Sequence, residues 1–340
     1  MQVLVTGGAG YIGSVMIPLL IESGCKVKCL DRFFFGKETL NDIMSNPNLE
    51  LIKDDIRWFN PKVLKDVDAV ADLAALSNDP SGELDPSKTF DINYLGRVRV
   101  AKLSKEYGVK RYILASSCSV YGFREDVILE ETSPTAPLTT YAKSNLMAEK
   151  DVLALSDSSF AVTVLRQATV YGLSPRMRFD LAINGMVLGL FKNKQIPVMR
   201  NGEQWRPFVH VKDTSKAFVT VMDSPEEKVN REIFNVGSNE QNYQIRPLAE
   251  MIGEALPVPL KIKWYGSPDK RSYRVSFDKI NKVLGFRTDY TPREGAVDVY
   301  EALERGKVTD SLKTKTVEWY KHLLGIHATV KDIALKDTIL

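Results

Sequence analysis

Three glycines near the N-terminus narrow the folds open to this chain. In the stretch VLVTGGAGYIG, the first residues form a β-branched run and a helical pattern follows, so Gly7, Gly10 and Gly13 fall in the turn between a strand and a helix. Glycines allow a tight turn, let the backbone approach a ligand, and let the helix pack closely on the sheet. The segment therefore predicts the first unit of a parallel α/β sheet.

Short β-branched runs alternate with helical patterns through the first half of the chain. Strands are predicted at QVLVT, KVKCL, LELI, DAVADLA and RYILASS, with one helix ending near Ser23 and a longer one running through Lys105. The stretch VTVLRQATVYG, from Val162, supplies a sixth strand. Parallel strands joined by crossover helices are expected, which predicts an α/β fold with a Rossmann-type, doubly wound parallel sheet.

The pattern loosens in the second half, where helical segments lie near residues 179–191 and 245–255 between shorter strands. We therefore predict a nucleotide-binding domain over residues 1–170. A smaller mixed α/β, substrate-binding portion is predicted over residues 171–325, with segments that partly return to the main sheet. Residues 326–340 are predicted to form a C-terminal tail, and no chemistry is recognised from about Ala328 onward.

The composition argues against several classes of function. The 340 residues include 46 basic and 43 acidic side chains without a long run of like charge, so no nucleic-acid or membrane surface is indicated. Cys25, Cys29 and Cys118 lack metal-ligand spacing, so reduced thiols and no metal site are expected. Because the sequence opens directly on a strand, with no basic region before an apolar run, a cytoplasmic location is the default expectation.

The glycine turn and the strand after it indicate a dinucleotide site. A helix N-terminus attracts a pyrophosphate, and Asp31 ends the second strand about twenty residues after the glycines, where an acid can accept bonds from ribose hydroxyls. Such a carboxylate repels a 2′-phosphate and favours NAD over NADP, although Arg32 beside it weakens that preference. Asp55 and Ile56, after the third strand, are candidates for the adenine edge.

Taken in order, these residues resemble the extended short-chain dehydrogenase/reductase family, and within it the nucleotide-sugar epimerases and dehydratases. The likeness runs from Gln2 to about Leu324. It implies a bound NAD and a nucleoside-diphosphate-sugar substrate. The motifs that carry it are TGGAGYIG, Asp31, DDI, LAA at Leu73 to Ala75, SSCSVYG at Ser116 to Gly122, and Tyr141.

The resemblance also implies a mechanism. In such enzymes a sugar hydroxyl is oxidised to a transient ketone and hydride later returns from the retained NAD. A tyrosinate is the base, a Ser or Thr polarises the same oxygen, and a lysine four residues after the tyrosine lowers the tyrosine pKa. Tyr141 and Ser117 stand at the first two positions. A phenol with an ordinary pKa near 10 is a poor base at neutral pH without a nearby cation.

Further contacts are assigned by the same resemblance. GEQWRPFVHVKD matches a substrate-phosphate segment and makes Arg206 the diphosphate contact, although Pro207 stands where an aspartate is usual. Thr169 occupies a position where an asparagine is common, and Arg271 is the first choice in DKRSYRV. His210, in the apolar FVHV, is expected to be a satisfied structural histidine.

The predicted contacts form two sets. The cofactor set is Gly7, Gly10, Tyr11, Ile12, Gly13, Asp31, Arg32, Asp55, Ile56, Leu73, Ala74, Ala75, Ser116, Tyr141 and Asn145. The substrate set is Ser77, Asn78, Ser117, Ser119, Thr169, Asn184, Arg206 and Arg271.

Two departures from the family pattern bear on the reaction. The 4,6-dehydratases carry an Asp-Glu pair directly after the catalytic hydroxyl residue, whereas this chain has Cys118 and Ser119, which disfavours dehydration. In YAKSN, Asn145 replaces the lysine. It shares a helix face with Tyr141 and is expected to reach towards a ribose hydroxyl, but it carries no charge. Lys143 points about 200° away and does not replace the lysine.

Asn145 leaves several accounts open. The leading hypothesis is a working NAD-dependent epimerase acting through a keto-sugar, with Tyr141 as base, Ser117 as polarising hydroxyl and another group assisting the base. The asparagine is otherwise a substitution introduced to trap a complex, or the mark of a binding protein that has lost turnover. Net oxidation or reduction of a nucleotide sugar is a further alternative.

The resemblance implies a homodimer. Members commonly pair through two helices, here around residues 90–107 and 141–155, to form a four-helix bundle. YLGRVRVAKLSKEYG has the apolar spacing for a packed face, although the same spacing would serve the core of one subunit.

Overall fold

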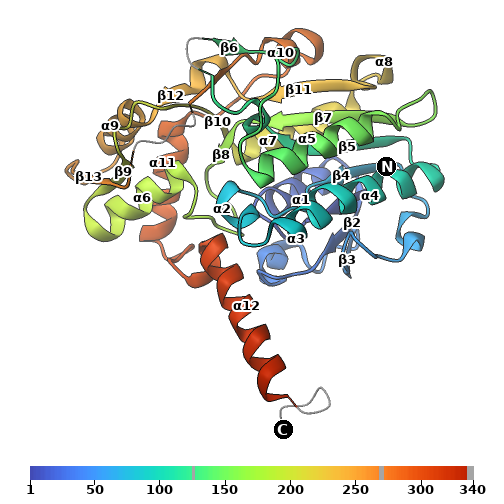
Figure 1. Ribbon diagram of the computed structural model, residues 1–340, viewed down its shortest axis with the longest axis horizontal. Coiled ribbons are helices and arrows are strands. Elements are labelled where there is room, and N and C mark those ends of the chain that lie inside the picture. The colour runs from blue at the N-terminus through green and yellow to red at the C-terminus, as the bar shows by residue number, and fades with distance from the viewer. Residues whose placement is uncertain (125–126, 268–271, 335–340) are drawn as a thin grey trace.

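The computed structural model describes residues 1–124, 127–267 and 272–334. Within these residues seven parallel strands form the central sheet, in the order β11-β7-β5-β4-β1-β2-β3 (Figure 1). The strand order reverses next to β1, as in Rossmann-type folds, and the predicted fold class is confirmed. The strands are β1 (Gln2–Thr6), β2 (Lys26–Asp31), β3 (Leu49–Lys53), β4 (Ala69–Asp72), β5 (Arg111–Ser117), β7 (Ala161–Gln167) and β11 (Glu232–Val236).

Helices cover both faces of this sheet, because its strands are apolar on both faces. Along β1, Val3 and Val5 pack into one core while Leu4 packs into the other. Helices α1 (Gly13–Glu22) and α7 (Val211–Asp223) contribute to the first core. Helices α4 (Arg97–Glu106) and α5 (Thr140–Leu153) contribute to the second.

The predicted long helix through Lys105 is three consecutive segments. Helix α3 (Pro86–Phe90) continues into the π-helical turn Asp91–Gly96, and α4 follows directly. A π-helical turn widens the backbone and changes which side chains face inward, and such turns occur frequently at functional sites. The first residue after it is Arg97.

The predicted sixth strand is also divided. VTVLRQATVYG forms β7 as far as Gln167, and β8 (Thr169–Tyr171) then leaves the main sheet to pair with β10 (Trp205–His210). The single long strand expected from the sequence is therefore wrong. Gln167 and Thr169 flank the break at Ala168, and no proline or glycine stands there. The change of pairing partner, from β5 to β10, therefore ends the first strand.

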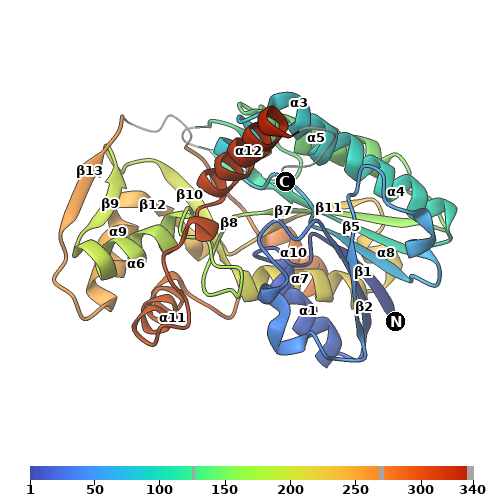
Figure 2. The same ribbon diagram turned by 90° about the horizontal axis from the view of Figure 1, so that it is seen from below.

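The rest of the described chain builds a smaller α/β portion. Three small sheets join β12, β10 and β8, then β13 and β9, then β14 and β6. Helices α6 (Ala182–Asn193), α9 (Ile245–Ala255) and α11 (Pro292–Glu304) share a separate core, and Figure 2 shows α6 and α9 on the opposite side of β8 and β10 from the main sheet. Strand β11 returns to the main sheet. The division at residue 170 stays a prediction.

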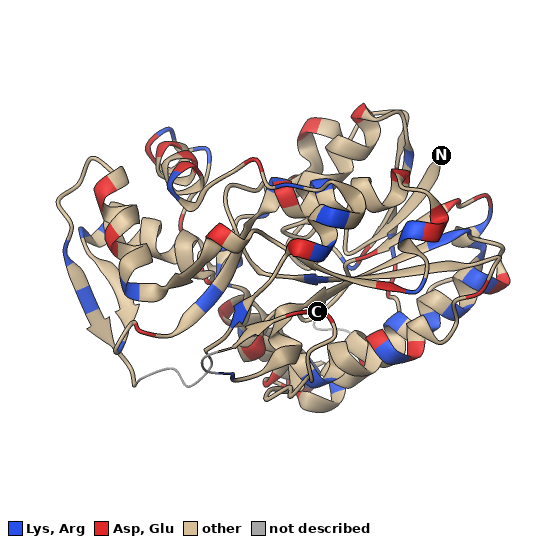
Figure 3. Ribbon diagram, turned by 90° about the horizontal axis from the view of Figure 1, so that it is seen from above, with Lys and Arg blue, Asp and Glu red and all other residues tan. Residues whose placement is uncertain are grey.

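The remaining elements are short, apart from the C-terminal helix α12 (Thr316–Ile333), which projects from the body (Figure 1). Basic and acidic residues are interspersed over the helices (Figure 3). In the described residues, no helix is both long and apolar enough to span a bilayer. The other elements are α2 (Asp79–Gly82), α8 (Glu226–Val229), α10 (Asp278–Leu284), β6 (Ile128–Leu129), β9 (Ile196–Met199), β12 (Asn242–Gln244), β13 (Ile262–Tyr265), β14 (Arg274–Val275) and the 3-10 turns Glu38–Ile43, Pro61–Leu64, Cys118–Tyr121, Asn239–Gln241 and Leu312–Thr314.

Candidate active site

A cavity of about 1150 Å³ lies at the carboxyl ends of the main-sheet strands and extends to β10. Ligand sites of α/β sheets occupy this edge, and single small ligands usually need 300–1,000 Å³, so there is room for a dinucleotide and part of a second ligand. The predicted residues that line it are Gly7, Gly10, Tyr11, Ile12, Gly13, Asp31, Arg32, Asp55, Ile56, Leu73, Ala74, Ala75, Ser77, Asn78, Ser116, Ser117, Ser119, Tyr141, Thr169 and Arg206.

The glycine turn has the geometry of a phosphate-binding loop. Gly7 has φ of +67°, and a Cβ there would lie 2.9 Å from the Ala74 backbone. At Gly13 a Cβ would lie 2.5 Å from Gly8. Among the described residues no side chain caps the first turn of α1, although the Ser14 N–H already donates to the Gly10 carbonyl at 3.0 Å. The positive end of the helix dipole lies at this loop and attracts an anion. This arrangement fits the pyrophosphate of a dinucleotide.

Asp31 stands at the end of β2 beside this loop. Its carboxylate accepts hydrogen bonds from the backbone N–H of Ala9 at 3.1 Å and of Phe33 at 2.7 Å. Burial raises the pKa of Asp31, while these two amides act in the opposite direction. The carboxylate is thus held in place, with acceptor capacity left for ribose hydroxyls.

Arg32 is turned away from Asp31 and pairs with Asp55. Its Nη1 lies 2.7 Å from Asp55 Oδ2, and Arg57 donates to both oxygens of the same carboxylate at 2.9 Å. Burial opposes ionisation of Asp55, but the bonds from Arg57 and Arg32 outweigh it and lower its pKa. The positive charge that weakened the NAD preference on sequence grounds is therefore paired.

Tyr141 and Ser117 line the middle of the cavity. Tyr141 lies in the first turn of α5, whose N-cap Thr139 accepts from the Ala142 N–H at 3.1 Å. Ser117 ends β5 and accepts from the Ser119 N–H at 3.2 Å. Burial raises the pKa of Tyr141, and the charge of Arg97 is the strongest influence that lowers it.

Asn145 does not line the cavity. Its side chain is fully buried, its Nδ2 donates to the Tyr141 carbonyl at 3.0 Å, and its Oδ1 accepts from Arg97 Nη1 at 2.7 Å. As placed, its amide is satisfied by protein and cannot reach a ribose hydroxyl. The sequence did not point to Arg97, because an arginine within GRVRV is usually a solvated charge on a helix.

Ser116 is also turned into the protein. Its hydroxyl donates to Glu149, which forms a buried 2.7 Å ion pair with Arg166. Cys118, at the first position of the dehydratase pair, is fully buried and donates to the Arg166 carbonyl at 3.3 Å. Burial raises the pKa of this thiol. Cys118 cannot act as an acid or base in the cavity.

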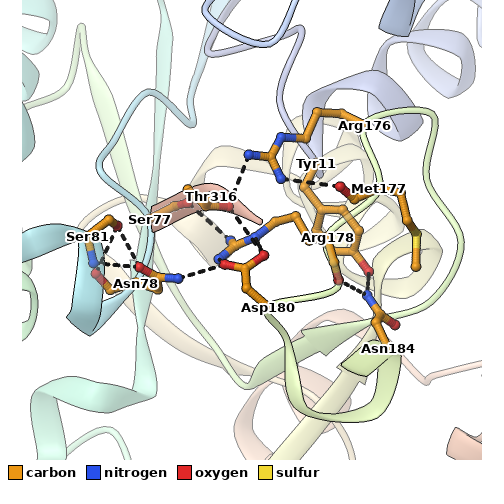
Figure 4. Close-up of polar contacts among 10 residues, drawn as sticks. All are labelled: Tyr11, Ser77, Asn78, Ser81, Arg176, Met177, Arg178, Asp180, Asn184 and Thr316. Atoms are coloured by element: carbon orange, nitrogen blue, oxygen red, sulfur yellow. Dashed lines mark hydrogen bonds and ion pairs between the residues drawn. The ribbon is translucent and has the colours of Figure 1, made fainter. Parts of the chain in front are cut away.

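Two arginines from the loop after β8 were missed by sequence reasoning. Arg178 pairs with Asp180 at 2.7 Å and donates to Ser77 Oγ at 3.1 Å, while the Asn78 amide donates to Asp180 at 2.9 Å (Figure 4). The predicted substrate contacts Ser77 and Asn78 therefore already bind this pair. Alternation of arginines in SPRMRFD, directly after a strand, was the signal that could have found them.

Arg176 lies beside Arg178 and also lines the cavity. Its Nη2 donates to Thr316 Oγ1 at 3.0 Å, and its guanidinium lies 3.6 Å from the centre of the Phe35 ring. Burial, with the charge of Arg178 added to it, lowers the pKa of Arg176 to about 10. A cation that is costly to bury in this way favours an anionic ligand nearby.

Asn184 holds the adjacent loops together. Its Nδ2 donates to Tyr11 Oη at 3.0 Å and to the Arg178 carbonyl at 2.9 Å (Figure 4). Its Oδ1 accepts from the Gly172 N–H at 2.9 Å. It is fully buried and does not line the cavity. Its predicted contact with substrate is not seen in this arrangement.

Two buried polar side-chain atoms belong to residues of the cavity lining. Ser119 Oγ and Gln204 Oε1 are buried and have no hydrogen-bond partner among the described residues. Arg206 lies on β10 in the same lining, with its guanidinium 5.3 Å from the Tyr273 ring centre. Buried polar groups of this kind are normally satisfied, which indicates a polar ligand here. Arg271 lies outside the described residues.

His210 differs from the satisfied histidine expected from the sequence. Its Nδ1 accepts from the Lys212 N–H at 3.3 Å, but its buried Nε2 has no hydrogen-bond partner among the described residues. The ring stacks on Tyr290 with 4.4 Å between centroids. Burial lowers the pKa of His210 to about 3, so the imidazole is neutral. It does not line the cavity.

The C-terminal helix closes one side of the nucleotide end. Trp319 Nε1 donates to the Phe34 carbonyl at 2.7 Å, and the Tyr320 ring lies 5.5 Å from that of Phe35. His327, within the predicted tail, also lines the cavity. The sequence assigned no role to His327, so its place in the lining comes only from the tertiary fold.

The sequence matches the NAD dependent epimerase/dehydratase family over residues 3–237, and the chain belongs to this family. The predicted resemblance is confirmed, as are the prediction of an enzyme and that of NAD as its cofactor. The loop at Gly7–Gly13 and the acid Asp31 are the residues that would hold it.

Individual relatives cover most of the chain. It is 28% identical to the UDP-glucose 4-epimerase of Streptococcus mutans serotype c, over 85% of this chain and 92% of that protein. It is 29% identical to UDP-glucuronic acid decarboxylase 1 of Arabidopsis thaliana, over 87% of this chain and 68% of that protein. The solved structure of MoeE5 in complex with UDP-glucuronic acid and NAD matches with a TM-score of 0.80 and 27% identity, covering 90% of this chain and 100% of that one.

Proposed function

We propose that this protein is an NAD-dependent nucleoside-diphosphate-sugar epimerase that works through a transient keto-sugar. The observation that carries the proposal is the continuity of one cavity. Its lining includes the glycine loop, Tyr141 and Ser117, Arg206, and Ser119, whose hydroxyl has no hydrogen-bond partner among the described residues. A phenol and a hydroxyl placed between a cofactor site and a phosphate-binding arginine suit proton and hydride removal from a sugar carbinol.

Each residue of the cavity has a separate role in the proposed reaction. Bound NAD supplies a reversible hydride acceptor. Tyr141 removes the proton of the sugar hydroxyl, and Ser117 donates a hydrogen bond to the same oxygen. Arg206 holds the diphosphate, which lets the sugar turn about its linkage and present the other face of the ketone. Tyr141 then returns the proton to the oxygen as the alcohol forms again.

The substrate class proposed is a uridine-diphosphate hexose or hexuronic acid, altered at C4. Support comes from the names of the relatives, which include UDP-glucose 4-epimerases and a protein bound to UDP-glucuronic acid. Dehydration is disfavoured because Cys118 is buried outside the cavity lining and Ser119 offers a hydroxyl instead of a carboxylate.

The experiment is proton NMR of a panel of UDP-sugars incubated with purified protein and NAD. The expected result is interconversion of C4 epimers without accumulation of NADH. Stoichiometric NADH from any panel member would identify net redox chemistry, and release of carbon dioxide from UDP-glucuronic acid would identify decarboxylation. Binding of NAD and a UDP-sugar without deuterium transfer from labelled sugar would identify a binding protein.

We also propose a homodimer. Its interface is formed by α5 and by the consecutive segments α3, the π-helical turn and α4. Leu95 and Met147 are 54% and 41% exposed on these segments, which supports an apolar contact with a second copy. Light scattering of the protein and of a Leu95→Glu, Met147→Glu variant tests this, and a monomeric parent protein would disprove it. A cytoplasmic location is part of the proposal and is tested by fractionation of the source cells.

A further inference from the structure

A buried arginine from a different helix, Arg97, lies against Asn145. Arg97 lies at the start of α4, directly after the π-helical turn, and is 2% exposed. It lines the same cavity as Tyr141, whereas Asn145 does not. The guanidinium of an arginine is a cation, so this part of the cavity wall carries a positive charge.

The position of Arg97 is set by two neutral acceptors. Its Nε donates to the Ala74 carbonyl at 3.1 Å, and its Nη1 donates to Asn145 Oδ1 at 2.7 Å. Among the described residues it has no carboxylate within ion-pair distance. Neutral acceptors orient the guanidinium without cancelling its charge.

Asn145 is suited to this orientation. Its Nδ2 donates to the Tyr141 carbonyl at 3.0 Å, which directs its oxygen towards Arg97. A lysine at this position would place a second cation against the guanidinium. The asparagine and the arginine are therefore complementary, and neither is explained well without the other.

We propose that Arg97 is a positioning residue that supplies the positive charge beside the Tyr141 phenol, and that Asn145 holds its guanidinium there. This inference rests on the proposed role of Tyr141 as a base. Burial raises the pKa of Tyr141, and the charge of Arg97 acts most strongly against that rise.

Other charges around Tyr141 are bonded elsewhere. Asp79, which raises the pKa of Tyr141, accepts from Thr139 Oγ1 at 2.7 Å, and Glu83 accepts from the Thr140 N–H at 2.7 Å. Lys88 on α3 pairs with Asp85 at 2.7 Å. Beneath α5, Arg166 and Glu149 pair with each other.

One carboxylate influences Arg97 from the sheet. Asp72, at the end of β4, accepts from Thr6 Oγ1 at 2.5 Å and from the Tyr112 hydroxyl. Burial raises the pKa of Asp72, and Arg97 lowers it. Because Asp72 accepts hydrogen bonds from other donors, it forms no ion pair with Arg97. Its negative charge only partly offsets the electrostatic effect of Arg97 on its surroundings.

The test observes the phenol directly. Protein labelled with [ζ-¹³C]tyrosine is titrated by NMR, with and without added NAD, and the Tyr141 signal is assigned by its absence from Tyr141→Phe. Arg97→Gln is expected to raise the pKa of Tyr141 by about one unit or more. Since only the phenolate is a base, the acidic limb of the pH–rate profile, where the rate rises with pH, should move to higher pH by the same amount. At a pH below the pKa of Tyr141, each unit of that shift lowers the rate about tenfold.

Two further variants keep the charge. Arg97→Lys should stay nearer to the parent pKa than Arg97→Gln. The double variant Arg97→Thr, Asn145→Lys moves the cation from α4 to α5 and should restore the parent pKa to within about 0.3 units. Arg99→Gln is the matched control, because Arg99 lies on the same helix and bonds the carbonyls of Arg57 and Phe59 away from Tyr141. It should leave the Tyr141 signal unchanged.

A folded Arg97→Gln protein whose Tyr141 pKa stays within about 0.3 units of the parent would overturn the proposal. If that variant does not fold, a folded double variant whose Tyr141 pKa lies about a unit or more above that of the parent would overturn it equally. The titration needs no sugar nucleotide, so failure of the epimerase proposal and failure of this one are distinguishable.

Discussion

The nucleotide end and the tyrosine corner of the cavity are built in different ways. The nucleotide end uses backbone, since Gly7 must adopt φ of +67° and a Cβ there would meet the Ala74 backbone at 2.9 Å. The tyrosine corner uses side chains from α4 and α5, with Arg97 bonded to Asn145 at 2.7 Å. Backbone geometry restricts the residue type at each position, whereas a charge can be delivered from more than one helix. A site built from backbone therefore tolerates few amino-acid substitutions. A site built from side chains tolerates the loss of a charge at one position when a second substitution supplies it from another.

The largest effect should come from Tyr141→Phe. Loss of the base should slow turnover by about 10³-fold, a magnitude typical of general acid–base groups, and leave NAD binding intact. The NMR epimerisation assay measures the rate, and NAD affinity is measured by calorimetry. Tyr107→Phe, at an exposed tyrosine, is the control. A rate within tenfold of the parent would show that Tyr141 is not the base. It would also contradict the contrast between a nucleotide end that binds NAD and a tyrosine corner that carries the chemistry.

At the nucleotide end, a substitution is expected to weaken NAD binding. Gly7→Ala strains a positive φ and drives a methyl group against Ala74, so NAD affinity should fall by about a hundredfold. Gly24→Ala is the matched control, because Gly24 has φ of +81° but nothing within 4 Å of its Cβ position. That control should cost about 1 kcal/mol of the free energy of unfolding and leave NAD affinity unchanged. Equal NAD affinities in the two variants would contradict the backbone account.

A smaller change is expected from Asp31→Asn, which keeps shape and removes charge. NAD affinity should fall about tenfold, because hydrogen bonds to a charged acceptor are stronger than those to an amide. Preference for NAD over NADP should narrow as the repulsion of a 2′-phosphate is lost. Calorimetry with both cofactors measures this, and Glu50→Gln on the exposed edge of β3 serves as control. An unchanged ratio of affinities would show that Asp31 does not select the cofactor.

The smallest effect concerns stability outside both ends. His210 is neutral when folded, since burial lowers its pKa to about 3, while the unfolded chain takes up a proton near pH 6.5. Its contribution is therefore fully present above pH 6.5 and is lost as pH falls towards 3, at up to about 1.4 kcal/mol per unit. The free energy of unfolding, measured with urea between pH 7 and pH 5, should depend less steeply on pH in His210→Asn than in the parent. His322→Asn, on exposed α12, is the control. Equal slopes for His210→Asn and the parent would exclude this linkage.

How much could be predicted from the sequence depended on whether the signal was local. The glycine turn, Asp31 and the pair Tyr141 and Ser117 were found because each stands at a fixed place relative to a strand or helix end. All of them line the cavity. Arg176 and Arg178 were missed because their role depends on a loop folding back beside Tyr11, more than 160 positions earlier in the chain.

The end of β7 illustrates the same limit. Nothing in VTVLRQATVYG marks a break, yet Gln167 pairs with β5 and Thr169 with β10. The turn of the chain out of the sheet places Thr169 in the cavity lining. Hydrophobic periodicity reports which residues are extended, but not which neighbour they pair with.

Sequence alone determined the class of sheet, the dinucleotide loop and the family motifs, because these depend on backbone conformation and on spacing within one strand, turn or helix. It also revealed that the expected lysine is missing. Only the tertiary structure decided where a cation lies instead, because Arg97 and Asn145 are 48 positions apart and meet through the packing of α4 on α5. Electrostatic effects depend on distance through space, and that distance is set by helix packing and not by order along the chain.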